Sequence, residues 1–277
     1  MFSFKKLIDE VNRPLVMGII NVTPDSFSDG GETFNLENVI EKVKTMCSEG
    51  ADIIDVGACS TAPKNTIVSE AEEIARLEKF LPEIIKVSTV PVSLDTLRPA
   101  VAEYGLSVGV SVINDESGAF NPLMAELVKE YGCGWIFMHT GGLSSRETKV
   151  YENGVVDDVC DFFERMKAEA MSFGLNEQQL AFDCGIGFGK TRDDDLILLN
   201  SCDKISKFSP LLFGVSRKRI IGELTHKENP KDRLSGSIAA AALLAYNGVR
   251  ILRVHDVGAT LDAIKISEAI KEVQYNG

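Results

Sequence analysis

The stretch Val110-Ser-Val-Ile-Asn-Asp115 shows the pattern that decides the fold, because its short, β-branched apolar run ends in polar residues. The same pattern recurs along the chain, at the apolar runs Leu15–Ile20, Ile53–Val56, Val90–Leu94, Val110–Ile113, Trp135–Met138, Leu180–Phe182, Leu211–Val215 and Arg250–Val254. Runs as continuously apolar as these are typical of strands that are buried on both faces, as in a parallel sheet. The sequence therefore predicts eight buried, parallel strands.

Helical stretches lie between these runs. In Ser69–Val87 the apolar residues recur three and four positions apart, as on one face of a helix, and Thr260–Val273 repeats that spacing. Eight alternating units in a chain of 277 residues predict an α/β fold, a (β/α)₈ TIM barrel that forms a single domain over residues 1–277. An open, doubly wound sheet remains the alternative, because periodicity does not distinguish an open sheet from a closed one.

The composition narrows the class of protein. The content of 44% hydrophobic and 25% charged residues is typical of a globular protein. The net charge of −12 argues against a nucleic-acid partner or binding to an anionic membrane surface. Asp9 and Glu10 interrupt the region where a signal peptide would need its apolar stretch. Six scattered cysteines without a Cys-x-x-Cys pair favour a cytoplasmic chain of reduced thiols, and three histidines show no zinc-binding spacing.

Polar residues follow all eight apolar runs. They include Asn21 and Asp25, Asp55, Asp95 and Thr96, Asn114 and Asp115, His139, Asp183, Ser216 to Lys218, and Arg253 to Asp256. One such residue alone is more often a helix cap or a turn residue, and His139 could equally be a core histidine. Since the active sites of α/β barrels lie at the carboxyl ends of the strands, polar residues at all eight ends indicate a site there.

The residue types indicate a class of ligand. Asp95, Asn114 and Asp183 combine carboxylate acceptors with an amide, and this set suits the aminopyrimidinone edge that pterins and guanines share. The last two strand ends add the basic side chains Arg217, Lys218, Arg253 and His255. In an acidic chain, such a cluster favours an anionic group, such as a leaving group, on the substrate.

Seven segments, in order along nearly the whole chain, carry a family resemblance. They are Gly18–Gly31, Gly50–Gly57, Ser93–Thr96, Ile113–Asp115, Gly185–Lys190, Gly214–Lys218 and Arg253–Val257. With these segments the chain resembles the dihydropteroate synthases, pterin-binding TIM-barrel enzymes of folate biosynthesis. The resemblance implies a transferase that condenses 6-hydroxymethyl-7,8-dihydropterin diphosphate with p-aminobenzoate, and it implies a homodimer.

The resemblance also implies roles for single residues. Asp95, Asn114, Asp183 and Lys218 would hold the pterin between the apolar side chains Met138 and Phe188. The diphosphate would be held by Asn21, Thr61, Arg253 and His255, with Asn21 as a ligand of a Mg²⁺ cofactor. The p-aminobenzoate site would be covered by Phe27, Ser28, Asp29 and Pro63, with Ser216 near the carboxylate. The catalytic set would be Asn21, Thr61, Lys218, Arg253 and His255.

The second loop departs from the family pattern Gly-Gly-Glu-Ser-Thr-Arg-Pro-Gly, since Cys59 replaces the glutamate and Ala62 the arginine. A pterin-binding homologue with reduced or lost activity is therefore one alternative. A second is a pterin-dependent corrinoid methyltransferase, which would have no evident use for Lys218, Arg253 and His255 as a diphosphate site. A third is a Schiff-base aldolase, which would require a buried Lys218 with a lowered pKa.

Overall fold

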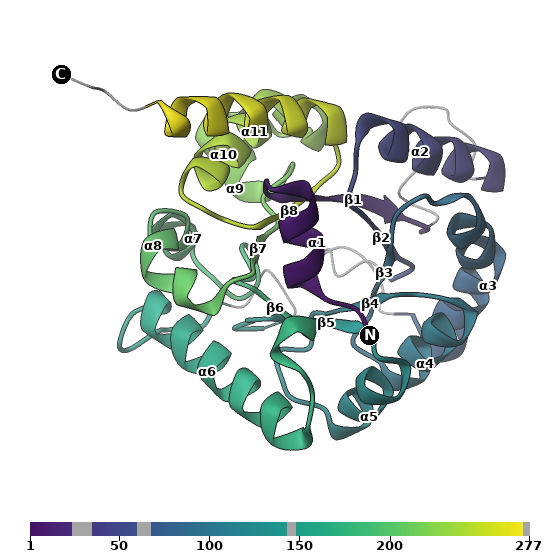
Figure 1. Ribbon diagram of the computed structural model, residues 1–277. Coiled ribbons are helices and arrows are strands. Elements are labelled where there is room, and N and C mark those ends of the chain that lie inside the picture. The colour runs from purple at the N-terminus through teal and green to yellow at the C-terminus, as the bar shows by residue number, and fades with distance from the viewer. Residues whose placement is uncertain (24–34, 60–67, 143–147, 274–277) are drawn as a thin grey trace.

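In the computed structural model eight strands form one closed, parallel barrel in which each strand pairs with its neighbour in sequence and β1 pairs with β8 (Figure 1). The strands are β1 (Leu15–Asn21), β2 (Ile53–Gly57), β3 (Val92–Asp95), β4 (Val112–Asp115), β5 (Gly134–Met138), β6 (Leu180–Asp183), β7 (Leu211–Phe213) and β8 (Ile251–Val254). The structure describes residues 1–23, 35–59, 68–142 and 148–273. The predicted TIM barrel is confirmed, and the open sheet is excluded.

All eight predicted apolar runs contain a strand, but β3 and β4 begin two residues later than the runs suggest. The run that starts at Val90 includes Pro91, which has no N–H to give to a neighbouring strand. Its carbonyl still accepts a hydrogen bond from Ile54 N, at 3.0 Å. Pro91 therefore marks the entry to the sheet, and the regular ladder starts at Val92.

Helices surround the barrel. The principal ones are α2 (Leu36–Glu49), α3 (Glu70–Val87), α4 (Pro99–Val108), α5 (Pro122–Tyr131), α6 (Val155–Phe173), α7 (Arg192–Leu199), α9 (Arg219–Thr225), α10 (Leu234–Tyr246) and α11 (Val257–Glu272). Shorter elements are α8 (Cys202–Ile205) and the 3₁₀ turns η2 (Glu177–Gln179), η3 (Ser206–Phe208) and η4 (Pro230–Arg233). Within the described part of the chain, no helix is both long and apolar enough to cross a membrane.

The helix α3 shows how closely the sequence determines these elements. Ser69 caps it by accepting a hydrogen bond from Glu72 N, and three glutamates in the first turn complement the helix dipole. The side chains of Leu77, Leu81 and Ile84 are buried against the barrel. The cap at Ser69 and the last residue, Val87, agree with the predicted helix Ser69–Val87. The helix α11, in contrast, begins at Val257, three residues before the predicted start at Thr260.

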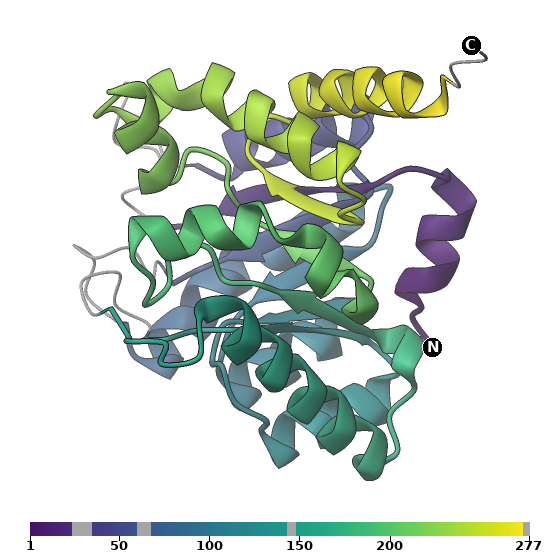
Figure 2. The same cartoon turned by 90° about the vertical axis from the view of Figure 1, so that its left-hand side faces the viewer.

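The helix α1 (Phe4–Val11) closes the amino-terminal end of the barrel (Figure 2). Phe4 and Ile8 pack into an apolar cluster with inward-facing strand residues such as Met17 and Ile53. Burying two side chains of this size stabilises the fold by roughly 3–6 kcal/mol. Since α1 fills this end with apolar side chains, the polar interior of the barrel lies at the carboxyl ends of the strands.

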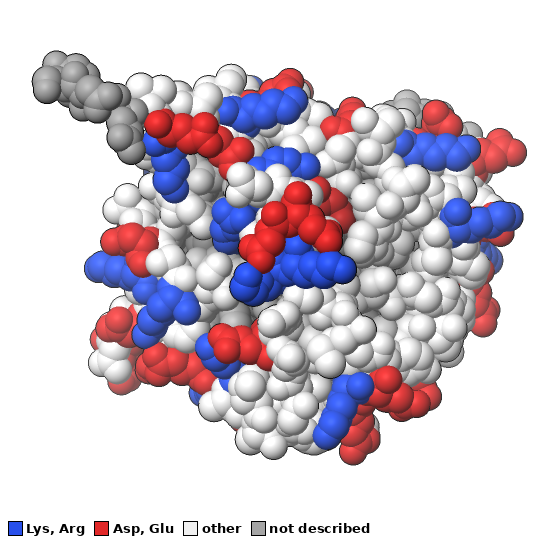
Figure 3. All heavy atoms as spheres, in the orientation of Figure 1, with Lys and Arg blue, Asp and Glu red and all other residues white. Residues whose placement is uncertain are grey.

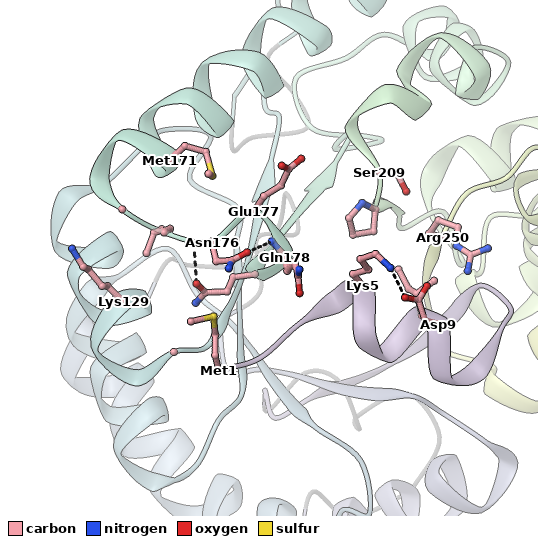
Figure 4. Close-up of a pocket in the computed structure, with 16 residues that line it drawn as sticks. Met1, Lys5, Asp9, Lys129, Met171, Asn176, Glu177, Gln178, Ser209 and Arg250 are labelled. Carbon is pink, nitrogen blue, oxygen red and sulfur yellow. Dashed lines mark hydrogen bonds and ion pairs between the residues drawn. The ribbon is translucent and has the colours of Figure 1, made fainter.

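A groove of about 910 Å³ runs beside α1 on this amino-terminal side, between α1 and the connection from α6 to β6 (Figure 4). Its lining includes Met1, Met171, Gln178 and Arg250, and none of the predicted site residues. Figure 3 shows the same side of the molecule, where Lys and Arg side chains are interspersed with Asp and Glu. This face therefore carries no broad basic surface of the kind that nucleic acids require.

Candidate active site

The predicted site residues in the described part of the chain gather at the carboxyl ends of the strands. Asn21, Asp95, Met138 and Asp183 are the last residues of their strands, and Asn114 is the last but one of β4. Arg253 lies within β8, and Ser216, Lys218 and His255 follow β7 and β8. The eight polar strand ends read from the sequence thus belong to one mouth of the barrel.

Asn21 and Asp95 approach one another over the bare backbone of Gly57, the last residue of β2. A Cβ atom at Gly57 would lie 3.4 Å from Asn21 Oδ1 and 3.5 Å from Asp95 Cβ. Both distances are ordinary van der Waals contacts, so the two side chains flank the position that a Cβ atom at Gly57 would occupy. An amide oxygen and a carboxylate therefore share one corner of the mouth.

Arg253 is the most strongly held cation of the site. Its Nε donates to Asp55 Oδ2 and its Nη2 donates to Asp95 Oδ2, both at 2.6 Å. Burial alone would lower the pKa of Arg253, but the carboxylates of Asp55 and Asp95 raise it, so the guanidinium is permanently charged. Its side chain is 14% exposed, which leaves one edge available to a ligand.

Lys218 and Arg253 both lie close to Gly214, and Lys218 reaches the turn after β6. Its Nζ donates to Ile186 O at 2.6 Å and lies 4.8 Å from the centre of the Phe188 ring. Burial lowers the pKa of Lys218, while the nearby carboxylate of Asp183 opposes that effect. Burial likewise raises the pKa of Asp183, against the effect of Lys218. Each group therefore offsets part of the effect of burial on the pKa of the other.

Ser216 and His255 form a second contact at the mouth. The Ser216 hydroxyl accepts a hydrogen bond from His255 N at 3.2 Å and lies 3.1 Å from His255 Nδ1. Burial, followed by the charges of Arg217 and Lys42, lowers the pKa of His255 to about 3. The ring is therefore neutral at neutral pH and can donate or accept a hydrogen bond.

The predicted cluster of four basic side chains needs correction on two counts. His255 adds no full positive charge to the free site, because burial and then its cationic neighbours lower its pKa to about 3. Arg217 is neutralised by Asp256, with Nε and Nη2 donating to the two carboxylate oxygens at 3.0 and 2.5 Å. Lys218 and Arg253 thus remain as the cations next to the predicted pterin residues.

Two further carboxylates lie at the mouth: Asp55, which the sequence places at a strand end without a ligand role, and Glu116, which the sequence analysis does not single out. Asp55 is fully buried, accepts from Asn114 Nδ2 at 3.4 Å and holds Arg253. Glu116 is 6% exposed, and after burial its charge is the largest cause of the raised pKa of Asp95. A signal for both was available, since Asp55 interrupts an apolar strand and Glu116 follows the pair Asn114 and Asp115.

Two buried side-chain oxygens of the mouth are available to accept hydrogen bonds from a ligand. Asp55 Oδ1 and Asn114 Oδ1 are buried and have no hydrogen-bond partner among the described residues. A buried acceptor without a donor costs roughly 1–3 kcal/mol, so a ligand that supplies N–H groups would recover that energy. An aminopyrimidinone edge presents such groups.

His139 and Asp115 have structural roles instead. The His139 side chain is buried, its Nε2 lies 2.8 Å from Asp158 Oδ1, and its ring packs edge-on against Phe162. Burial and the charge of Lys190 lower the pKa of His139 to about 4. Asp115 accepts a hydrogen bond from the indole N–H of Trp135 at 3.2 Å. Burial of the ring and its contacts favour the core interpretation of His139, although its buried Nδ1 has no hydrogen-bond partner among the described residues.

The base of the second loop is held by two arginines. Arg76 Nη1 donates to Ala58 O at 3.1 Å, and Arg98 Nη2 donates to Val68 O at 2.7 Å. Arg98 is in turn paired with Glu73, whose other oxygen accepts from Thr96 Oγ1 at 2.9 Å. Burial raises the pKa of the Cys59 thiol at this base, so a neutral group stands where the family has glutamate.

The remaining predicted residues lie outside the described residues: Phe27, Ser28, Asp29, Thr61, Ala62, Pro63 and Lys64. The described ranges also contain no group of three His, Cys, Asp or Glu side chains that could hold a metal ion. The predicted metal ligand, Asn21, lies within the described residues, at the end of β1.

Comparison with known proteins gives one consistent result. The model of the pterin binding enzyme family matches residues 17–255. Over 267 residues the chain is 36% identical to the dihydropteroate synthase of Synechocystis sp., with 95% of this chain and 92% of that protein covered.

Solved structures give the same result. The dihydropteroate synthase of Xanthomonas albilineans with 4-aminobenzoic acid has a TM-score of 0.88 at 37% identity, with 95% of both chains covered. The complex of that enzyme with 7,8-dihydropteroate has a TM-score of 0.84 at 35% identity, with 95% of this chain and 96% of that chain covered.

Proposed function

Since this chain belongs to the dihydropteroate synthases of the pterin-binding enzyme family, we propose that its barrel mouth condenses a dihydropterin diphosphate with p-aminobenzoate. The products are 7,8-dihydropteroate and diphosphate, and one domain over residues 1–277 carries the reaction. The observation that carries the proposal is the contact chain from Asp55 through Arg253 to Asp95, beside Lys218 and Asp183. It places hydrogen-bond acceptors for a pterin next to cations for a diphosphate.

The pterin binds at the acceptor side of this cluster. Asp183 and Asp95 accept the amino and ring N–H groups, and Asn114 adds an acceptor that has no partner among the described residues. Lys218 donates to a ring nitrogen or carbonyl of the pterin. Phe188, which already lies against Lys218, and Met138 form the apolar walls.

The diphosphate binds at the cationic side. Arg253 contributes a permanent charge, His255 a neutral ring N–H, and Asn21 and Thr61 polar side chains. Asn21 also fits a magnesium ligand, because this ion prefers oxygen donors and commonly takes one or two from the protein and others from phosphate. When bound, magnesium would neutralise charge on the departing diphosphate.

The reaction breaks the bond between the pterin methylene carbon and the diphosphate oxygen, and the electron pair leaves with the diphosphate. Arg253 and His255 stabilise the negative charge that develops there. The positive charge left on the pterin is delocalised into its ring, near Asp95 and Asp183. The amino nitrogen of p-aminobenzoate then attacks the methylene carbon and loses a proton. Ser216 lies near the p-aminobenzoate carboxylate, and Phe27 and Pro63 cover that substrate.

Two alternatives predict different outcomes. Lys218 is buried with a lowered pKa, the condition for a Schiff-base lysine, but its ammonium is bound to Ile186 O and stacks on Phe188. A homologue without synthase activity would bind pterin but form no product, and Cys59 and Ala62 are the residues that favour it. Incubation with both substrates and mass spectrometry of the products tests all three. We expect 7,8-dihydropteroate from the wild type and none from Asp183→Ala, whereas pterin binding without product would overturn the proposed function.

We also propose a cytoplasmic homodimer. All six cysteines are free, as a reducing compartment favours. The helices α10 and α11 pack together and expose large apolar side chains, among them Leu243 at 65%, Ile266 at 62% and Ile270 at 60%. Light scattering should give twice the chain mass of 30.2 kDa, and a charged residue at Leu243 and Ile266 should give the monomer.

A further inference from the structure

Lys190 is a fully buried lysine with no assigned role. It ends the segment Gly185–Lys190, is 1% exposed and forms no ion pair with any described residue. Its ammonium donates instead to three backbone carbonyls, His139 O at 3.2 Å, Gly185 O at 2.9 Å and Phe188 O at 3.2 Å. A lysine ammonium has three N–H donors, so all of them are used inside the protein. Burial lowers the pKa of Lys190 to about 8.

These carbonyls join the end of β5 to the turn that follows β6. Gly185 and Gly189 both adopt φ of 63°, in the left-handed region. A Cβ atom at Gly185 would lie 1.9 Å from His139 O, and one at Gly189 would lie 2.3 Å from Gly141 C. The turn is thus pressed against residues 139–141, with several carbonyl oxygens directed to one point. Lys190 supplies the positive charge at that point.

The same turn carries the groups that face the pterin site. Gly185 N donates to Asp183 Oδ1 at 2.8 Å, and Ile186 O accepts from Lys218 Nζ. The Phe188 ring lies under that ammonium. From the far side, Gly187 N donates to Asp195 Oδ1 at 2.8 Å, and Asp195 is 1% exposed. A shift of the turn would therefore move an acceptor, a cation and an aromatic wall together.

We propose that Lys190 is a positioning residue of the pterin site, which fixes the turn from Gly185 to Gly189 so that Asp183, Phe188 and Lys218 hold the pterin ring. This inference rests on the proposed function. Lys190 does not act as a nucleophile or touch substrate, because its three N–H groups point to carbonyls and its side chain is sealed from the mouth. Its effect reaches the pterin through the backbone of the turn.

The experiment compares pterin binding by calorimetry in the wild type and in Lys190→Met, which keeps the length of the side chain but removes the ammonium. We expect Lys190→Met to bind 6-hydroxymethylpterin at least roughly tenfold more weakly than the wild type does. Its KM for p-aminobenzoate, measured at saturating pterin diphosphate, should change by less than about twofold. Lys129→Met is the matched control, since Lys129 also donates to one backbone carbonyl, Phe173 O, but far from the mouth. It should leave both values unchanged.

A second variant tests the inference if Lys190→Met does not fold. Asp195→Asn weakens the same turn from the far side through Gly187 N, and it should reduce pterin affinity with the same selectivity. Wild-type pterin affinity in a folded Lys190→Met, or in Asp195→Asn if Lys190→Met does not fold, would overturn the inference. An equal rise in the KM of both substrates would do the same, because it would indicate a merely structural role. A wild type that binds no pterin would instead overturn the proposed function.

Discussion

Arg253 and Asp55 form a largely buried ion pair that spans β1 at the barrel mouth, with Arg253 Nε 2.6 Å from Asp55 Oδ2 and the Asp55 side chain fully buried. The two residues are 198 positions apart in sequence. The same guanidinium holds Asp95, so Asp55 fixes the direction of the charge that a diphosphate would meet. This contact joins the cationic side of the site to its acceptor side.

The first prediction concerns this pair. Asp55→Asn keeps the shape of the side chain but removes the charge that orients Arg253. We expect kcat/KM for the pterin diphosphate to fall roughly tenfold, with a loss of about 1–3 kcal/mol in the free energy of unfolding. Asp52→Asn is the matched control, because Asp52 holds Arg13 at 2.7 Å at the amino-terminal end. It should cost similar stability and no activity. Equal activity of the two variants would contradict the role of Asp55.

The second prediction concerns His255, whose pKa is lowered to about 3 by burial and by the nearby cations. A bound diphosphate replaces that repulsion with attraction, so it favours the imidazolium and must raise the pKa. Diphosphate should consequently bind more tightly as the pH falls towards the new pKa. NMR titration of the His255 ring with and without diphosphate measures the shift. An unchanged pKa would place His255 outside the diphosphate site.

The third prediction concerns stability and His139. Its folded-state pKa of about 4 lies below the ordinary 6.5, so the unfolded chain takes up this proton first as the pH falls. The stability from the neutral ring is therefore complete above pH 6.5 and is lost between pH 6.5 and 4, by up to about 3 kcal/mol. Denaturant unfolding of His139→Asn should show a shallower slope over this range. The exposed His226 is the control, and His226→Asn should keep the wild-type slope.

The fourth prediction concerns magnesium. We expect chelation to remove most of the turnover and added magnesium to restore it, because the charge that develops on the departing diphosphate exceeds what the guanidinium of Arg253 can neutralise. Asn21→Ala should raise the magnesium concentration needed for half-maximal rate. Near-full turnover of the chelated enzyme would contradict the proposed cofactor.

The barrel could be predicted from the sequence because strands buried on both faces leave an uninterrupted apolar run, as at Trp135–Met138. The grouping of Asp95, Asn114, Asp183 and Lys218 at one mouth followed from that fold. The ion pairs and charge states of the site, in contrast, could not be predicted from the sequence. Asp55 could be placed at a strand end, but its pairing with Arg253 could not be predicted because the last strand supplies that partner. The neutral state of His255 likewise depends on neighbours that only folding brings together.

The rate of diphosphate release from the dihydropterin diphosphate, measured with a coupled assay in the presence and absence of p-aminobenzoate, tests the proposed condensation most directly. The proposed reaction should release diphosphate rapidly with both substrates, slowly without p-aminobenzoate, and in an amount equal to the 7,8-dihydropteroate formed. Release that does not depend on p-aminobenzoate, or no release from an enzyme that binds pterin, would contradict it.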